Sequence, residues 1–167
     1  MQMIGAERLV EALASDDWSE RAEAMTRLQA LGDRAVPVLV IGATHPDAGV
    51  RAESVALMDH LADTRCVAAL KSALSDRSAR VRRLAVHSIG CQRCKVAPLG
   101  IDVVGLLVER ASWDSSARVR RVAVHQLGLQ VADRRAIEAL EDILRRESDP
   151  KLRSRAEFAL RQQRATA

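Results

Sequence analysis

The chain repeats one pattern five times. In each copy, an Arg that follows an apolar residue, or a residue standing in its place, opens a stretch of small and aliphatic residues that usually ends in Gly. The anchor arginines are Arg21, Arg51, Arg82, Arg120 and Arg153, so the copies are spaced by 30, 31, 38 and 33 residues. A period of this length is typical of a solenoid, in which one unit cannot bury its own apolar face and must stack on its neighbours.

Each copy is expected to form a helix that pairs with a shorter second helix. In the third copy, Val81, Leu84, Ala85, Ser88 and Ile89 recur at the spacing of one helix face. Turns that contain Asp or Ser precede the anchors and are typical of helix N-caps. The pattern predicts ten helices in five antiparallel pairs, over residues 4–14, 18–31, 34–43, 48–62, 65–74, 78–90, 101–111, 116–130, 133–146 and 150–163.

The apolar positions predict one continuous core. Aromatic residues are scarce, with two Trp, one Phe and no Tyr, which suits thin helix interfaces filled by Ala, Val and Leu. We expect Trp18 in this core and Cys66 as a small buried filler, while Trp113 in a turn is either an apolar plug or an exposed contact. The other side chains expected to be buried are Leu39, Leu70, Val81, Ala85, Ile89, Leu107, Val119, Ala123, Leu127 and Leu140.

The recurrent order of Asp, Val-Arg, small aliphatic residues and Leu-Gly, followed by a helix such as residues 34–39, resembles the HEAT-like repeats of the phycobilisome-lyase type. The resemblance covers nearly the whole chain. It implies an all-α fold, a right-handed α-solenoid of the armadillo and HEAT kind with about five antiparallel helix pairs. It also implies a single domain over residues 1–167, with repeats at about 4–31, 34–62, 65–90, 101–130 and 133–163.

The same resemblance implies a structural role for the Arg after the Val, which pairs with a turn Asp of its own or the adjacent repeat. The arginines concerned are Arg51, Arg82, Arg120 and Arg153, and the expected partners are Asp47, Asp76, Asp114 and Asp149. The first copy has Glu20 in place of the Val, as expected for a capping repeat with a polar outer side.

The 38-residue interval contains a longer connection that carries a Cys-x-x-Cys. His87 stands four residues before Cys91 and can share a helix face with it, and His125 occupies the register position of His87 in the next copy. Because packed helices lie about 8–10 Å apart, His87, Cys91, Cys94 and His125 could converge on one structural Zn²⁺. The alternative is a solvent-edge loop with two reduced thiols, in which case no cofactor is expected.

Basic charge is concentrated in the middle of the chain. Residues 71–135 hold 13 Lys and Arg against 5 Asp and Glu, a net charge of +8, whereas residues 1–70 have a net charge of −5. Arg80, Arg83, Arg118, Arg121 and Arg155 form a stripe across repeats three to five, with Arg83 pointing to solvent. The stripe is either a solvated face or a binding surface for an anionic partner, which would be an acidic protein surface, a nucleic-acid backbone or a lipid head group. Trp113 is an additional candidate contact.

No catalytic motif accompanies the repeats. Phosphate-binding, serine-nucleophile and zinc-protease motifs are missing, and no His is followed by Glu, so the paired iron motifs of deoxyhypusine hydroxylase-like repeat proteins are absent. The low aromatic content also disfavours a tetrapyrrole site like that of phycobilin lyases. The sequence therefore predicts a non-enzymatic interaction or scaffold module whose partner is an acidic protein surface. The alternative is a nucleic-acid-associated protein that holds duplex phosphates through repeats three to five.

Three features of the sequence predict where the protein is located. There is no run of 18 apolar residues, so no membrane span is expected, and the first ten residues do not resemble a signal peptide. Three cysteines, an odd number, argue against a disulfide scaffold and favour the cytoplasm.

Overall fold

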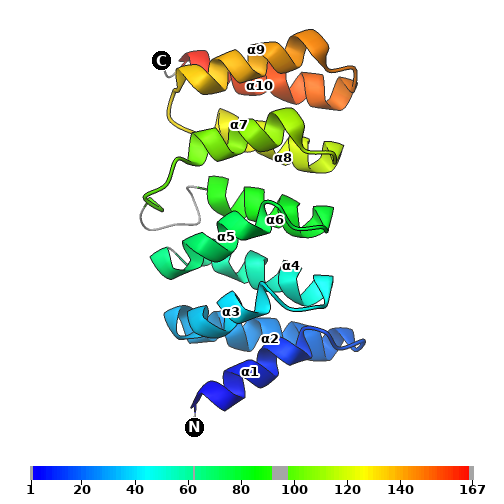
Figure 1. Ribbon diagram of the computed structural model, residues 1–167, viewed down its shortest axis with the longest axis vertical. Helices are drawn as coiled ribbons and strands as arrows, with labels where there is room; N and C mark the ends of the chain where they lie inside the picture. The colour runs from blue at the N-terminus through cyan, green and yellow to red at the C-terminus, as the bar shows by residue number, and fades with distance from the viewer. Residues whose placement is uncertain (1, 62, 92–97, 166–167) are drawn as a thin grey trace.

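The computed structural model describes residues 2–61, 63–91 and 98–165, and over these the chain is a stack of helices (Figure 1). No strand occurs in these ranges, and no helix within them is long and apolar enough to cross a lipid bilayer. The helices are α1 (Gln2–Ala12), α2 (Trp18–Leu31), α3 (Val36–Gly42), α4 (Ala48–Leu57), α5 (Val67–Ala73), α6 (Ala79–Gly90), α7 (Val103–Trp113), α8 (Ala117–Gly128), α9 (Arg134–Arg146) and α10 (Pro150–Ala165).

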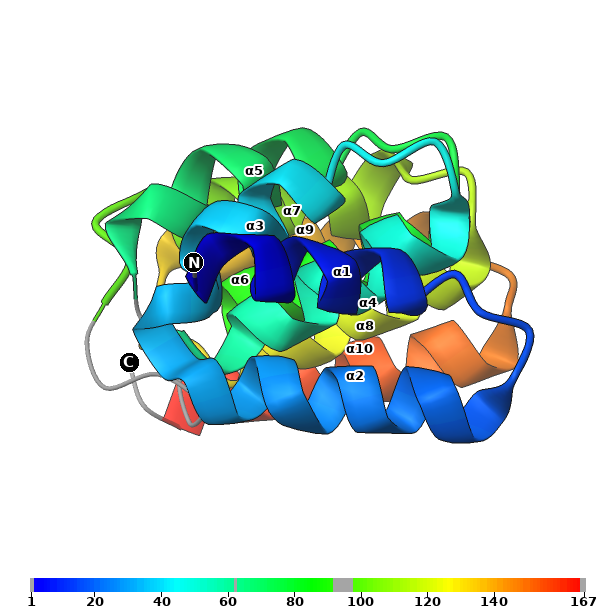
Figure 2. The same ribbon diagram turned by 90° about the horizontal axis from the view of Figure 1, so that it is seen from below.

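The helices form two layers. Each odd-numbered helix packs against the even-numbered helix that follows it, and the even-numbered helices also pack on one another from α2 to α10. Seen along the stack, the odd-numbered helices lie on one side and the even-numbered helices on the other (Figure 2). This arrangement confirms the α-solenoid that the period predicts.

The core runs through the whole stack, from Ala6 in α1 to Leu160 in α10. All ten side chains expected at its centre are buried, and Cys66 is buried as well. The expectation for Trp18 is wrong, because 73% of this residue is exposed. Trp18 opens α2, whose buried residues are Ala24 and Leu28, and its ring lies on the flank that borders Glu53 of α4.

Most helix boundaries agree with the prediction to within a few residues. The helix expected over 48–62 ends at Leu57 and continues as a 3₁₀ turn, η2 (Met58–His60). The helix expected from residue 34 begins at Val36, because η1 (Gly32–Ala35) precedes it, and Gly32 enters this turn with a φ of 54°. A positive φ is a conformation that glycine adopts without steric cost.

The Gly at the end of the third and fourth copies allows close packing of the even-numbered helices. A Cβ atom added to Gly90 would lie 2.6 Å from the Cβ of Gln126. A Cβ added to Gly128 would lie 2.9 Å from the Cα of Ala159. The absence of a side chain at Gly90 and Gly128 therefore permits the close approach of α6 to α8 and of α8 to α10.

Candidate functional site

The anchor arginines link successive turns at one edge of the stack. Arg51 donates from Nε to Asp76 Oδ2 at 2.7 Å and from Nη2 to Asp76 Oδ1 at 3.0 Å. Arg82 repeats this bidentate contact with Asp114 at 2.8 and 2.9 Å. In both cases Nη1 binds the carbonyl oxygen of the residue's own turn, that of Pro46 for Arg51 and that of Asp76 for Arg82. Each arginine thus ties its own turn to the next one.

The acceptor carboxylates also cap helices. Asp76 accepts a hydrogen bond from Ser78 N at 2.7 Å, and Asp114 accepts one from Ser116 N at 2.8 Å. The hydrogen bond from Arg51 lowers the pKa of Asp76. Burial by itself would raise the pKa of Asp114, but the hydrogen bonds from Arg82 and Ser116 outweigh burial and lower it. The structural role implied for Arg51 and Arg82 is confirmed, with the partner in the adjacent turn.

The last link uses a different carboxylate from the expected one. Arg120 donates to Glu147 at 3.0 Å, so the expectation that it pairs with the side chain of a turn Asp, of its own or the adjacent repeat, is wrong. The longer Glu side chain reaches Arg120 from two positions earlier, and Asp149 accepts instead from Arg121 at 2.9 Å. Arg153 donates to the carbonyl oxygens of Leu144 and Glu147, at 2.6 and 3.1 Å, and forms no ion pair with a turn Asp among the described residues, so its expected pairing is wrong as well.

The first joint of the stack lacks this link. Asp47 accepts from Gly49 N and Val50 N at 2.7 and 3.0 Å, and so caps α4. Arg21 donates to the carbonyl oxygen of Ser15 in its own turn. Within the described ranges, no ion pair joins Arg21 to Asp47.

The predicted basic stripe lies on three stacked helices. Arg80 and Arg83 belong to α6, Arg118 and Arg121 to α8, and Arg155 to α10. Arg80 pairs with Glu53 of α4, and Arg121 pairs with Asp149. Among the residues that the structure describes, Arg83, Arg118 and Arg155 form no ion pair.

The environment of the three unpaired arginines differs along the stripe. Arg118 and Arg155 are exposed, whereas Arg83, which was expected to point to solvent, is half-buried. Two of the five predicted charges are thus compensated within the chain, and Arg118 and Arg155 are the two exposed arginines that form no ion pair within the described residues.

The stripe ends at a shallow hollow of about 270 Å³ between α8 and α10. It is lined by His125, Arg155, Phe158 and Arg161, together with small residues of α10. Half of Phe158 is exposed, and the guanidinium of Arg161 lies 5.9 Å from the centre of its ring. Burial, and then the charge of Arg155, lowers the pKa of His125.

Phe158 was not predicted as a site residue, although its position in the repeat register indicates this place. It stands five residues after its anchor Arg153, as His87 stands five after Arg82 and His125 five after Arg120. The same position of the repeat, on α6, α8 and α10, is therefore occupied by His87, His125 and Phe158 in successive copies.

Trp113 lies apart from the stripe. It is the last residue of α7 rather than a turn residue, and 71% of it is exposed. Its ring lies under the guanidinium of Arg146, 4.4 Å from the ring centre. Of the two predicted roles, the exposed contact therefore fits and the apolar plug does not.

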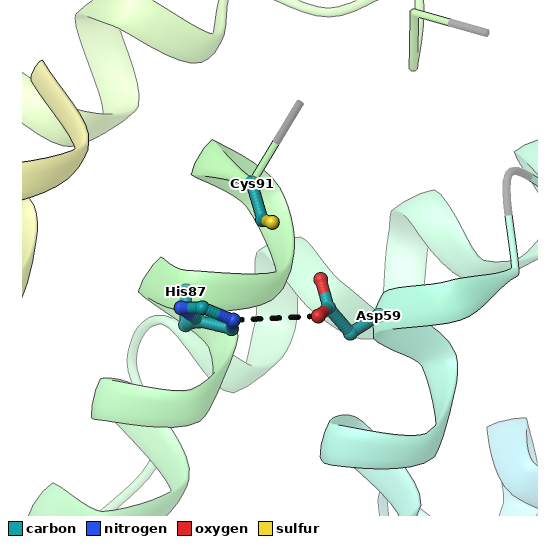
Figure 3. A group of neighbouring side chains, drawn as sticks. All are labelled: Asp59, His87 and Cys91. Carbon is teal, nitrogen blue, oxygen red and sulfur yellow. Dashed lines mark ion pairs between the residues drawn. The ribbon is translucent and has the colours of Figure 1, made fainter. Parts of the chain in front are cut away.

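A second cluster lies near the end of α6, where Asp59 of η2 faces His87 and Cys91 (Figure 3). His87 Nε2 lies 3.3 Å from Asp59 Oδ2. One ligand atom from each residue lies within 4.8 Å of the other two. Asp59 and Cys91 are buried, whereas 46% of the His87 side chain is exposed.

The cluster shares two residues with the zinc site expected from the sequence. His87 and Cys91 come together as expected, while His125 is not one of the three grouped ligands. Cys94 lies outside the described residues. Asp59 was missed because a single carboxylate carries no motif. Its place could have been deduced from the stacking, since the end of the second copy lies beside the end of the third.

Comparison with known proteins identifies related repeats. A family model of HEAT repeats matches residues 6–90 and 67–161. No curated protein matches the chain.

Several solved structures share the fold. The complex of CpcE and CpcF of phycocyanin lyase from Nostoc is 22% identical over 94% of this chain and 98% of that chain, with a TM-score of 0.78. The Escherichia coli protein YibA is 19% identical over 96% of this chain and 61% of that one, with a TM-score of 0.67. A designed armadillo repeat protein in complex with the peptide (KR)4 is 18% identical over 94% and 81%, with a TM-score of 0.60.

Proposed function

The chain belongs to the HEAT repeat family, and from this premise we propose that it is a protein-interaction module that binds an acidic segment of a partner protein. The binding surface is the exposed side of α6, α8 and α10. The observation that carries the proposal is the set of three arginines on these stacked helices, Arg83, Arg118 and Arg155, that form no ion pair within the described residues. Unlike the anchor arginines, they are not committed to holding the fold together.

The chemistry of arginine favours a carboxylate-bearing partner. A guanidinium presents a planar fork of N–H donors that can bind both oxygens of one carboxylate, as Arg51 and Arg82 do within the fold. The net charge of +8 over residues 71–135 would also speed encounter with an acidic chain. The exposed ring of Phe158 adds an apolar contact beside Arg155.

Two structural relatives support partner binding as a role of this fold. The designed armadillo repeat protein is in complex with a peptide of Lys and Arg, and CpcE is in complex with CpcF. The charge of the stripe in this chain is opposite to what a basic peptide requires. By the same electrostatic argument, an acidic segment is the complementary ligand.

Duplex nucleic acid is the competing ligand. Each phosphate contact by an unpaired Lys or Arg contributes about −0.9 to the slope of log K against log salt. Arg80 and Arg121 are already engaged by Glu53 and Asp149, which leaves three stripe cations for phosphates. This small number favours a short acidic segment over a long duplex.

The experiment is a fluorescence anisotropy titration with two labelled probes, a peptide that alternates Glu and Ser and a duplex DNA of arbitrary sequence. Arg118→Glu combined with Arg155→Glu should weaken peptide binding at least about tenfold, because charge-assisted hydrogen bonds contribute about 1.5–3 kcal/mol each. A matched control, Arg134→Glu with Arg145→Glu, places the same charge change on α9 in the other layer and should have little effect.

The outcomes separate the alternatives. Equal loss in both double variants would show that the attraction follows net charge rather than this surface. Tight binding of the duplex with no binding of the peptide would replace the proposal by the nucleic-acid alternative.

A further inference from the structure

The side chains at the end of α6 combine three different metal-ligand chemistries. Asp59 supplies a carboxylate, His87 an imidazole and Cys91 a thiol, from two stacked elements (Figure 3). Around a tetrahedral Zn²⁺, with bonds of about 2.0–2.3 Å, neighbouring ligand atoms lie about 3.5 Å apart. The observed separation of 3.3 Å between His87 and Asp59, and the limit of 4.8 Å for the whole group, require only small side-chain movements to reach that geometry.

A buried glutamine orients the imidazole from its other side. Gln126 of α8 is 2% exposed, and its Nε2 lies 3.1 Å from His87 Nδ1. The other amide atom, Oε1, has no hydrogen-bond partner among the described residues. Gly90 permits this approach, since a Cβ there would meet the Gln126 side chain. A buried polar atom without a partner is costly, so its position next to the cluster calls for an explanation.

A half-turn of the Gln126 amide would bring this unpaired oxygen to His87 Nδ1. In the observed orientation the amide N–H donates to His87 Nδ1, so in neutral imidazole the ring proton lies on Nε2 and faces Asp59. After a half-turn, Oε1 accepts from Nδ1–H, and Nε2 presents its lone pair to the space between Asp59 and Cys91. That is the tautomer a metal ion requires, and a hydrogen-bond acceptor behind a ligating His is a common feature of zinc sites.

We infer that Asp59, His87 and Cys91 form a three-ligand site for Zn²⁺, with Gln126 as the positioning residue of His87. The nitrogen, sulfur and oxygen donors are those that zinc binds in proteins. Among the described residues no fourth ligand joins these three, and 46% of the His87 side chain is exposed to solvent.

A nucleophilic cysteine is a poorer interpretation of the same cluster. A Cys91 nucleophile would need a ring nitrogen of His87 as its base. Within the described residues neither ring nitrogen is hydrogen-bonded to the Cys91 thiol, since Nε2 lies 3.3 Å from Asp59 and Nδ1 lies 3.1 Å from Gln126. A shared metal ion explains why the Asp59 carboxylate, the His87 imidazole and the Cys91 thiol are grouped together, whereas a nucleophile activated by His87 would not need Asp59 and Cys91 to be close to each other.

The test uses the full chain, stripped of metal by a chelator and titrated with Zn²⁺ and, separately, Co²⁺. We expect one ion per chain, and for Co²⁺ the near-ultraviolet band of thiolate-to-metal charge transfer. Asp59→Asn, His87→Gln and Cys91→Ser should each lower the Zn²⁺ affinity at least tenfold, and Cys91→Ser should abolish the charge-transfer band. Binding that withstands all three substitutions would overturn the inference.

The role of Gln126 has its own pair of variants. Gln126→Leu removes the acceptor and should lower the Zn²⁺ affinity by about 10–100-fold, the usual effect of losing such a partner. Gln126→Glu keeps an acceptor at the same place and should retain binding. If both variants bind as the wild type does, Gln126 is not a positioning residue.

Two controls distinguish this site from incidental metal binding. Cys66→Ser removes a buried thiol in another part of the stack, and His125→Ala removes the histidine in the equivalent register position; neither should change the affinity. Circular dichroism melting of each variant verifies the fold. Failure of the wild-type chain to bind one Zn²⁺ or show the Co²⁺ band would overturn the site whatever the variants do.

Discussion

Arg82 and Arg83 are neighbours in the sequence but have different structural environments. Arg82 holds the carboxylate of Asp114, which is only 4% exposed, and also binds the carbonyl oxygen of Asp76. Arg83 forms no ion pair within the described ranges and lies on the stripe. Adjacent residues on a helix point in different directions, so the Arg82 guanidinium lies against the turns while Arg83 lies on the stripe.

Replacing Arg82 should therefore destabilise the fold much more than replacing Arg83. Arg82→Ala leaves Asp114 buried without its main partner, and breaking a buried pair in this way costs about 3–5 kcal/mol. Arg83→Ala removes no described ion pair and should change the free energy of unfolding by about 0.5 kcal/mol or less. Urea denaturation of the two variants measures both values, and equal losses would contradict the assigned roles.

The pH dependence provides an internal control for this comparison. Asp114 has a pKa below its ordinary value of 3.8, so the stability it contributes is fully present above that pH and is lost as the pH falls through the lowered pKa. In Arg82→Ala the buried carboxyl takes up a proton more readily. The difference in stability between wild type and variant should be largest near neutral pH and should narrow in acid.

The residue contacts were only partly predictable from the sequence. The Val-Arg pattern with a turn Asp located the pairs of Arg51 and Arg82. It did not reveal that Arg120 binds Glu147 rather than a turn Asp, because Glu147 and Asp149 lie in the same turn and only side-chain reach decides between them. Buried glutamines were missed for a similar reason, since an isolated Gln gives no indication of what it will bind.

At the scale of helices, glycine controls how closely neighbours approach. Gly128→Ala would place a Cβ 2.9 Å from the backbone of Ala159, which cannot move without shifting α10. We expect a loss of about 1–3 kcal/mol from overpacking, although alanine's better helix propensity offsets part of it. Gly5→Ala is the matched control, because nothing lies within 4 Å of an added Cβ there. It should be neutral or slightly stabilising in thermal unfolding.

Helix order and the buried face were predictable, whereas the ends of some elements were not. Apolar spacing identified the core because burial of one face is what a stacked helix requires. The burial of Trp18 was predicted wrongly, because this residue lies in the first turn of α2, before the buried positions Ala24 and Leu28. Asp59 lies in the 3₁₀ turn over residues 58–60, where the sequence predicted a continuous helix. This turn supplies one ligand of the candidate metal site.

At the scale of the whole molecule, period and register explain which site residues could be anticipated. His87 and Cys91 share a helix, so their proximity follows from sequence spacing alone. Asp59 joins them through stacking, which requires knowledge of how far one helix is shifted along the next. The stripe was located correctly on α6, α8 and α10, but the compensation of Arg80 by Glu53 depends on a contact between copies that the sequence does not reveal.

The missing link at the first joint has a consequence for how the stack opens. The contacts of Arg51, Arg82 and Arg120 fasten each later turn to the one after it, while over the part of the chain that the structure describes α2 has no such ion pair to the turn before α4. The first helices also leave a hollow of about 920 Å³ beside Ala6, Leu9 and Leu31. In a stack whose units contact only their neighbours, local opening starts where the interface is weakest.

Native-state hydrogen exchange should therefore show an asymmetric molecule. Amides of α1 and α2 should exchange through local opening at a lower free energy than those of α6 and α8, which should exchange only on global unfolding. Uniform protection along the chain would contradict this gradient. If the gradient holds, helices α1 and α2 can detach and re-form while α6, α8 and α10, which carry the arginines of the stripe, keep their spacing. The chain could then be cut by a protease near its amino terminus and still retain a ligand bound to the stripe.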